Sequence, residues 1–191
     1  MWAALRFLMG VCYDEAVFAF ERGTHMKPLF TTARCAVWPM RADDVDALLP
    51  LLTDTRVRAY LGGPCTAVQA YQKLNRWLNA QDALHWVVRE TSTDAVLGLL
   101  SVSPHHDPRD MELSYQFLPA YWGHGYAAEA LRAALAYIEE TMPLKRIVSE
   151  TQEKNIASCR LLEKLGYQLA STCERFGETQ RIYIDCFQKG E

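Results

Sequence analysis

The chain has 191 residues, of which 50% are hydrophobic and 11% aromatic, enough for one well-packed core and too few for two. Its 20 basic and 23 acidic residues give a formal net charge of −3, and the basic residues form no run longer than a pair. This composition excludes the positively charged surface expected of a protein that binds nucleic acid.

The six cysteines are scattered and have no spacing typical of a zinc site. We therefore expect reduced thiols in a cytoplasmic protein, most of them in the core. The cysteines are Cys12, Cys35, Cys65, Cys159, Cys173 and Cys186.

The N-terminal segment begins like a signal peptide, but Asp14 and Glu15 follow a very short apolar run that has a single early positive charge. Secretion is therefore not expected, and no stretch approaches the roughly 18 apolar residues that a membrane span needs. We interpret residues 1–25 as an extension of uncertain role and residues 26–191 as a single domain.

The first elements of the domain are a strand and two helices. Alternating side chains predict a strand over residues 31–38, and an acidic cluster then starts a helix that Pro50 must kink or shorten. A turn at residues 62–64 leads to a second helix, which Thr66 and Gln69 cap and which ends near Asn79. The acidic cluster consists of Asp43, Asp44 and Asp46.

The remaining elements complete a mixed α/β fold. Three strand-like stretches joined by short polar turns favour antiparallel pairing. A helix, a strand, a second helix closed by Gly166 and a hairpin around Gly177 follow. The predicted strands are 84–90, 95–102, 111–118, 146–151, 167–174 and 179–187, and the predicted helices of this part are 127–142 and 156–165.

Two glycines, Gly123 and Gly125, stand just before the helix predicted over 127–142. A helix start has free N–H groups and partial positive charge, and glycine allows both left-handed torsions and close approach of a ligand, so a phosphate site is one interpretation. An ordinary strand-to-helix turn is the other. A dinucleotide-binding fold is not expected because the preceding strands look antiparallel, and the Walker motif is absent because no G-K-[ST] follows.

The segments "YWGHGYAAEALRAAL" and "NIASCRLLEKLGY" resemble the GNAT superfamily of acetyl-CoA-dependent N-acetyltransferases. The phosphate motif of that family, Q/R-x-x-G-x-G/A, maps onto residues 122–127, with Trp122 in place of the usual first residue. This departure and "YLGGP" at 60–64 are typical of the branch that contains the Rim-type ribosomal-protein N-terminal acetyltransferases. The resemblance spans residues 31–187 and implies a mainly antiparallel sheet that is splayed between its fourth and fifth strands.

The resemblance also implies how acetyl-CoA, the co-substrate, is bound. Loop amides would hold its pyrophosphate, and the pantetheine arm would lie in the splay, pairing with strand backbone that polarises the thioester carbonyl. Asn155 would bond the pantetheine amides, cap its helix, or do both. The expected cofactor-binding residues are Phe117, Leu118, Trp122, Gly123, His124, Gly125, Tyr126, Ala127 and Asn155.

Two residues are candidates for moving protons. Glu112, near the start of the fourth strand of the sheet, is either the general base or a solvated strand carboxylate. Ser158 either donates to the departing thiolate or bonds its own helix. Tyr167 and Tyr183 are alternative acids that more often pack in a core with their hydroxyls satisfied.

The histidines of "SPHHDPRD" are adjacent in a proline-containing loop, a pattern that seldom converges on one ion, so we expect no metal. His105, His106 and Asp107 are instead expected in a substrate-side or plain solvent loop.

The acceptor is expected to be a primary amine. At pH 7 an α-amine of pKa about 8 is roughly ten per cent neutral, against well under one per cent for lysine, which favours an α-amine of a protein or peptide. A small molecule such as an antibiotic or a polyamine stays open, as does a non-catalytic acyl-CoA sensor. The sequence allows a monomer or a homodimer.

Overall fold

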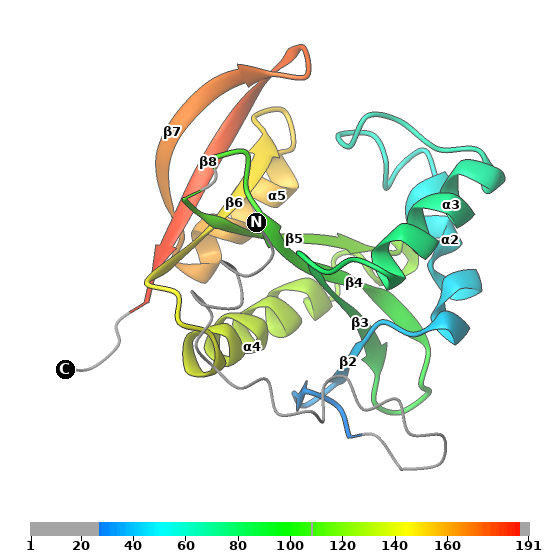
Figure 1. The fold of residues 1–191 in the computed structure, drawn as a ribbon. Helices are drawn as coiled ribbons and strands as arrows, with labels where there is room; N and C mark the ends of the chain where they lie inside the picture. The colour runs from blue at the N-terminus through cyan, green and yellow to red at the C-terminus, as the bar shows by residue number, and fades with distance from the viewer. Residues whose placement is uncertain (1–26, 108, 188–191) are drawn as a thin grey trace.

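The computed structural model describes residues 27–107 and 109–187, so the predicted extension 1–25 and Cys12 lie outside the described residues. The described chain forms one eight-stranded sheet in the order β1-β2-β3-β4-β5-β6-β8-β7 (Figure 1). The strands are β1 (Phe30–Thr31), β2 (Cys35–Pro39), β3 (Leu84–Glu90), β4 (Val96–Pro104), β5 (Met111–Phe117), β6 (Arg146–Gln152), β7 (Gln168–Arg175) and β8 (Glu178–Cys186).

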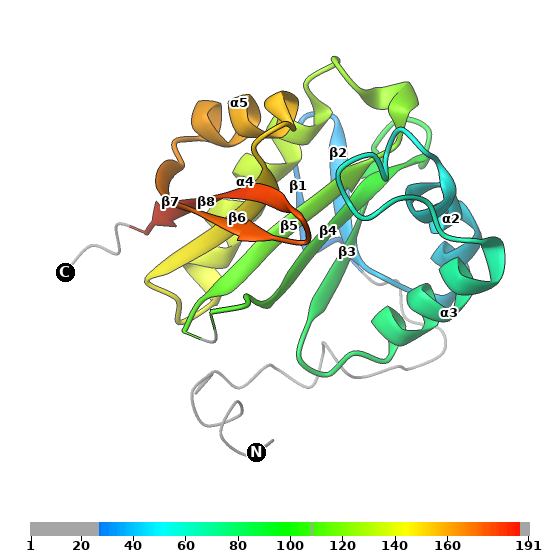
Figure 2. The ribbon, with the colours of Figure 1, turned by 90° about the horizontal axis from the view of Figure 1, so that it is seen from above.

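Two pairs of helices cover the two faces of this sheet (Figure 2). Strand alternation divides the core accordingly: Trp86 and Val88 of β3 pack in the cluster with α4 and α5, whereas Val87 packs in the cluster with α2 and α3. The helices are α2 (Val45–Thr53), α3 (Ala67–Leu78), α4 (Tyr126–Thr141) and α5 (Ile156–Leu165), with short 3₁₀ turns η2 (Ala42–Asp44) and η3 (Pro119–Tyr121). In the described part of the chain, no helix has both the length and the apolar character needed to span a bilayer.

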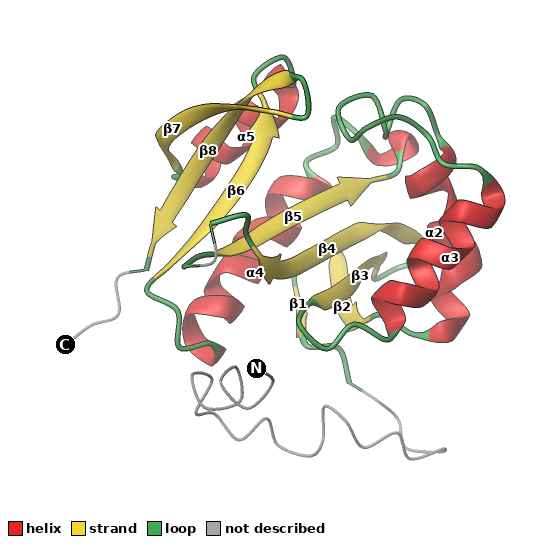
Figure 3. Cartoon of the chain, turned by 45° about the horizontal axis from the view of Figure 1, so that its top comes forward, coloured by secondary structure: helices red, strands yellow, loops and turns green. Residues whose placement is uncertain are grey.

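The sheet opens between β5 and β6. These two strands are parallel and pair at one register position, Glu112 with Val148, and α4 is the crossover that a parallel pair requires. Figure 3 shows β6, β7 and β8 rising away from β5 as a separate wing. All other neighbouring strands are antiparallel, which confirms the predicted mainly antiparallel sheet. The predicted splay between the fourth and fifth strands is also confirmed, because β5 and β6 are the strands predicted as fourth and fifth.

The prediction of a single first strand over 31–38 is wrong, because the chain reverses at residues 32–34 and makes two strands, β1 and β2. The hydroxyl of Thr32 accepts the backbone N–H groups of Arg34 (3.3 Å) and Cys35 (2.9 Å). Short side chains that bond nearby backbone in this way favour turns over continued strand. Alternation of side chains alone did not reveal this competition.

The predicted helix ends are largely confirmed. Thr66 and Gln69 form the expected capping box of α3, and Asn79 is its C-cap. Gly166 closes α5 with a left-handed φ of 102°. Pro50 lies inside α2, which ends at Thr53, in agreement with a shortened helix.

Candidate active site

The loop before α4 has the geometry of an anion cradle. Gly123 and Gly125 adopt φ angles of 75° and 83°, and Gly125 is the N-cap of α4, whose start has no side-chain cap. The bond from the Glu129 N–H to the Gly125 carbonyl (3.1 Å) closes the first turn of the helix, so the preceding amides of the turn, including those of Tyr126 and Ala127, have no partner within it. A Cβ built on Gly123 would meet nothing within 4 Å. These free amides and this open space fit a diphosphate group.

The backbone of β5 faces the splay at every second residue. The Leu118 N–H donates to the Leu97 carbonyl of β4 (2.9 Å), so by the alternation of an antiparallel ladder the backbone groups of Phe117 and Tyr115 point the other way, into the gap. The Phe117 carbonyl accepts from the indole N–H of Trp122 (2.7 Å). The expectation of a free amide at Leu118 is therefore corrected, and Phe117 is the neighbouring residue whose N–H faces the gap.

Ser158 lies at the start of α5, opposite β5. Its backbone N–H donates to Oδ1 of Asn155 (3.2 Å), so Asn155 is the N-cap of α5. The Ser158 hydroxyl bonds the phenol of Tyr115 (2.7 Å) across the opening of the sheet, a partner that sequence reasoning missed. Burial raises the pKa of Tyr115 to about 12, which keeps this phenol protonated. The alternate positions of β5 could have indicated Tyr115, which shares a face with Leu113 and Phe117.

Glu112 occupies the one register position at which β5 pairs with β6. Its side chain is half-buried, and burial raises the pKa of the carboxyl above its ordinary value. The carboxylate of Glu150 adds to this shift, whereas His105, Arg175 and a hydrogen bond from the Glu150 backbone N–H oppose it. Among the described residues no cation lies within salt-bridge distance of Glu112. Its environment therefore differs from that of a fully solvated strand carboxylate.

A buried polar cluster lies beside Glu112 and was also missed from the sequence. The His105 Nδ1 accepts the backbone N–H of Asp107 (3.1 Å), so the ring proton lies on Nε2 and donates to Glu150 (2.8 Å). Arg175, from the outer strand β7, forms an ion pair with the same carboxylate. Because His105 is 6% exposed, it does not belong to a plain solvent loop; it lies beside Glu112.

The other proposed acids and loop residues have partners elsewhere. The buried Tyr183 donates to Glu163 (2.9 Å), and the buried Tyr167 lies 3.3 Å from the Ser149 hydroxyl, as expected of core tyrosines. His106 packs against the ring of Phe176, with centroids 5.6 Å apart. No group of three or more possible metal ligands occurs in residues 27–107 and 109–187.

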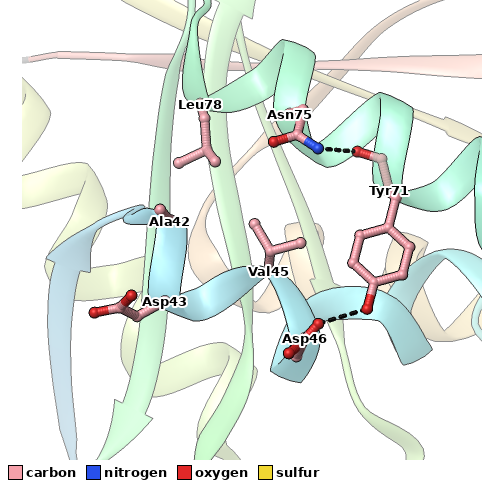
Figure 4. A pocket seen from close by; sticks show the side chains of 7 residues that line it. All are labelled: Ala42, Asp43, Val45, Asp46, Tyr71, Asn75 and Leu78. Atoms are coloured by element: carbon pink, nitrogen blue, oxygen red, sulfur yellow. Dashed lines mark hydrogen bonds between the residues drawn. The ribbon is translucent and has the colours of Figure 1, made fainter.

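A surface pocket between α2 and α3 contains none of the predicted site residues (Figure 4). Its wall is closed by the Tyr71 hydroxyl, which donates to Asp46 (2.6 Å), and by Asn75, whose amide donates to the Tyr71 carbonyl (3.0 Å). The pocket lies on the helices and not at the splay, so we assign it no part in the chemistry.

Taken together, the splayed sheet and the uncapped glycine cradle define an acyl-CoA-binding fold. The chain matches the family described as "Acetyltransferase (GNAT) domain" over residues 34–168 and belongs to that family. The family transfers acetyl groups from acetyl-CoA, so the protein is an N-acetyltransferase of the GNAT class with acetyl-CoA as co-substrate.

Individual relatives are distant. The uncharacterized protein YkkB of Bacillus subtilis is 29% identical over 100 residues, which cover 51% of this chain and 58% of that protein. The RimL ribosomal L7/L12 α-N-protein acetyltransferase has a TM-score of 0.74 at 15% identity, covering 87% of this chain and 98% of RimL. Spermidine N-acetyltransferase from Vibrio cholerae, solved with CoA and spermine, has a TM-score of 0.71 at 15% identity, covering 81% of this chain and 96% of that protein. The two structures establish similarity of fold alone.

Proposed function

We propose that the protein transfers the acetyl group of acetyl-CoA directly to the α-amine of a protein or peptide. The observation that carries this proposal is the charge balance beside the splay. Glu150 forms an ion pair with Arg175 and bonds His105, whereas Glu112, which both groups influence from a greater distance, forms no ion pair of its own among the described residues. A single carboxylate without an ion pair suits an acceptor that has one amine.

A polyamine is a polycation and is recognised best by several unpaired carboxylates. The loop between α2 and α3 instead brings a cation to the face of the sheet on which Glu112 lies. There Arg58 donates to the side chain of Gln116 in β5 (3.4 Å). The similarity of fold to both RimL and a spermidine acetyltransferase supports either acceptor equally. The charges therefore favour an α-amine over a polyamine.

We assign the catalytic roles from the positions of the residues around the splay. Glu112 takes a proton from the attacking amine, directly or through water, and its raised pKa brings it nearer to the amine than an ordinary glutamate. The Phe117 N–H stabilises the tetrahedral oxyanion. Ser158 donates a hydrogen bond to the sulfur as the thiolate departs, while the loop amides of His124 to Ala127 and the cap residue Asn155 hold the cofactor.

The test is thiol release from acetyl-CoA with N-terminal peptides, lysine peptides, polyamines and aminoglycosides as acceptors, using the Glu112→Gln variant as the matched control. We expect the largest kcat/KM with a peptide that has a free α-amine and a large loss in the variant. Faster turnover with a polyamine would contradict the acceptor class. Tight acetyl-CoA binding without turnover on any amine would favour the acyl-CoA sensor.

A further inference from the structure

An acidic residue stands in the first turn of α4, next to the loop that would hold a diphosphate. Glu129 is the acidic residue of that turn, and its side chain is 21% exposed. A carboxylate stabilises the start of its own helix. At this place, however, the same charge repels a phosphate ligand unless a cation cancels it.

The cation is supplied from a distant part of the sequence. One oxygen of Glu129 accepts the Thr32 hydroxyl (2.6 Å) and the Arg34 backbone N–H (2.8 Å), and the other accepts Nε of Arg34 (2.7 Å) and pairs with its terminal nitrogen (2.7 Å). Burial opposes ionisation, but the hydrogen bonds from Thr32 and Arg34 hold the pKa of Glu129 below its ordinary value. The carboxylate is therefore ionised and directed at the turn between β1 and β2.

This arrangement fixes the guanidinium of Arg34 against the glycine loop. Its remaining terminal nitrogen donates to the His124 carbonyl (3.0 Å), and its central carbon lies 4.4 Å from the ring centre of Tyr126. The Tyr126 hydroxyl in turn donates to Glu90 (2.5 Å). A Cβ on Gly125 would lie 3.4 Å from Arg34, so the guanidinium forms one wall of the loop.

The contact with the His124 carbonyl has a geometric consequence. In a trans peptide the C=O and the following N–H point in opposite directions. Because Arg34 holds the His124 carbonyl on its own side, the N–H of Gly125 is directed away from Arg34.

We propose that Arg34, held in place by Glu129, is a positioning residue for the diphosphate of acetyl-CoA. It orients the peptide between His124 and Gly125 so that the N–H faces the anion, and it cancels the charge of Glu129 beside that anion. This inference rests on the assignment of acetyl-CoA to the cradle.

The experiment measures the dissociation constants of CoA, dephospho-CoA and pantetheine by calorimetry. A ligand that binds weakly is measured by a displacement titration. Arg34→Met is expected to weaken CoA and dephospho-CoA about tenfold, or about 1.4 kcal/mol, and to leave pantetheine, which has no diphosphate, unchanged. Arg34→Met combined with Glu129→Gln should recover part of the loss, because the repelling carboxylate is removed while the loop stays unanchored. Arg132→Met, which removes the same charge from an exposed position of α4, should change affinity less than twofold.

Wild-type binding of CoA tests the cofactor assignment first, and its absence would overturn that assignment together with this inference. If the wild type binds CoA, the inference alone is overturned by an Arg34→Met affinity within twofold of wild type, or by an equal loss for CoA and pantetheine. Arg34 is 45% exposed, so the variant should fold. Should its thermal unfolding show otherwise, Arg34→Lys, which keeps the charge without the planar fork, is judged by the same comparison of ligands.

Discussion

The hydrogen bond between Tyr115 and Ser158 makes a quantitative prediction. It joins β5 to α5 across the splay at 2.7 Å. A bond between two neutral groups contributes about 0.5–1.5 kcal/mol, and leaving the half-buried Ser158 hydroxyl unsatisfied adds to the loss. Tyr115→Phe removes one oxygen atom and is therefore expected to lower the free energy of unfolding by about 1–2 kcal/mol, a fall in Tm of roughly 2–8 °C for a domain of this size.

The effect on turnover is expected to differ between the two partners. The pKa of Tyr115, about 12, exceeds the thiol value of about 8.5 by roughly 3.5 units, so full proton transfer from the phenol to the thiolate is uphill by about 5 kcal/mol. Tyr115 can therefore orient and polarise Ser158 but cannot act as the proton source. Ser158→Ala is expected to lower kcat about tenfold to a hundredfold and Tyr115→Phe less, with little change in the affinity for CoA.

The assay combines thermal unfolding with thiol release in a double-mutant cycle of the two substitutions. A coupling of about 1 kcal/mol in stability is expected, because either single variant already breaks the bond. Tyr167→Phe, a buried tyrosine whose hydroxyl lies 3.3 Å from Ser149, is the matched control and should cost stability without changing kcat. Wild-type turnover in Ser158→Ala would refute the role given to this serine.

Three further predictions concern the base, the cradle and the buried cluster. Glu112→Gln should lower kcat/KM by about 10²–10⁴. Because burial raises the pKa of Glu112 in the folded state, its contribution to stability is present below the unfolded pKa of about 4.3 and is lost as pH rises through the folded value, so the Gln variant should have a higher Tm at pH 7 in a pH series of melts. A Tm of the Gln variant equal to that of the wild type across this pH series would contradict the raised pKa of Glu112. Gly125→Ala should weaken CoA about fivefold to thirtyfold in calorimetry, because a left-handed φ of 83° costs a side chain about 1–2 kcal/mol and the loop of the free variant relaxes away from it. Unchanged affinity would show that the free variant keeps this left-handed φ. Glu150→Ala should lower stability by about 1–3 kcal/mol in denaturant titration, since it leaves Arg175 and the buried His105 without their shared acceptor, and a neutral result would mean that water replaces the carboxylate.

The glycine loop before α4 and the start of α5 could be predicted from the sequence because each is built from neighbouring residues. Gly123, Gly125 and the helix that follows lie within one short segment, and the N-cap Asn155 stands three positions before Ser158. Local rules on glycine torsions and helix starts apply directly to such segments. The motif-level resemblance to the family was also strongest there.

The other partners came together only through the tertiary fold. The pair of Arg34 and Glu129 is separated by 95 positions in the sequence, and His105 and Glu150 are separated by 45. No periodicity or spacing links such residues, and the turn that carries Arg34 was hidden in a predicted continuous strand. Burial, which raises the pKa of Glu112, likewise depends on how β5 and β6 meet.

The alternation of side chains along β5 has a consequence for the order of the chemistry. Tyr115 belongs to the face that packs against α4 and α5, where Ser158 lies, whereas Gln116 bonds Arg58 on the face of α2 and α3. Glu112 shares the parity of Gln116, so the proposed base and the partner of Ser158, Tyr115, lie on opposite faces of one strand. A thioester held in the splay would then present its sulfur to Ser158 and its carbonyl carbon to an amine that arrives beside Glu112. An amine and a thioester that meet between these two faces need no covalent acetyl-enzyme, so we expect direct transfer. Steady-state kinetics with intersecting rather than parallel double-reciprocal lines are the corresponding signature.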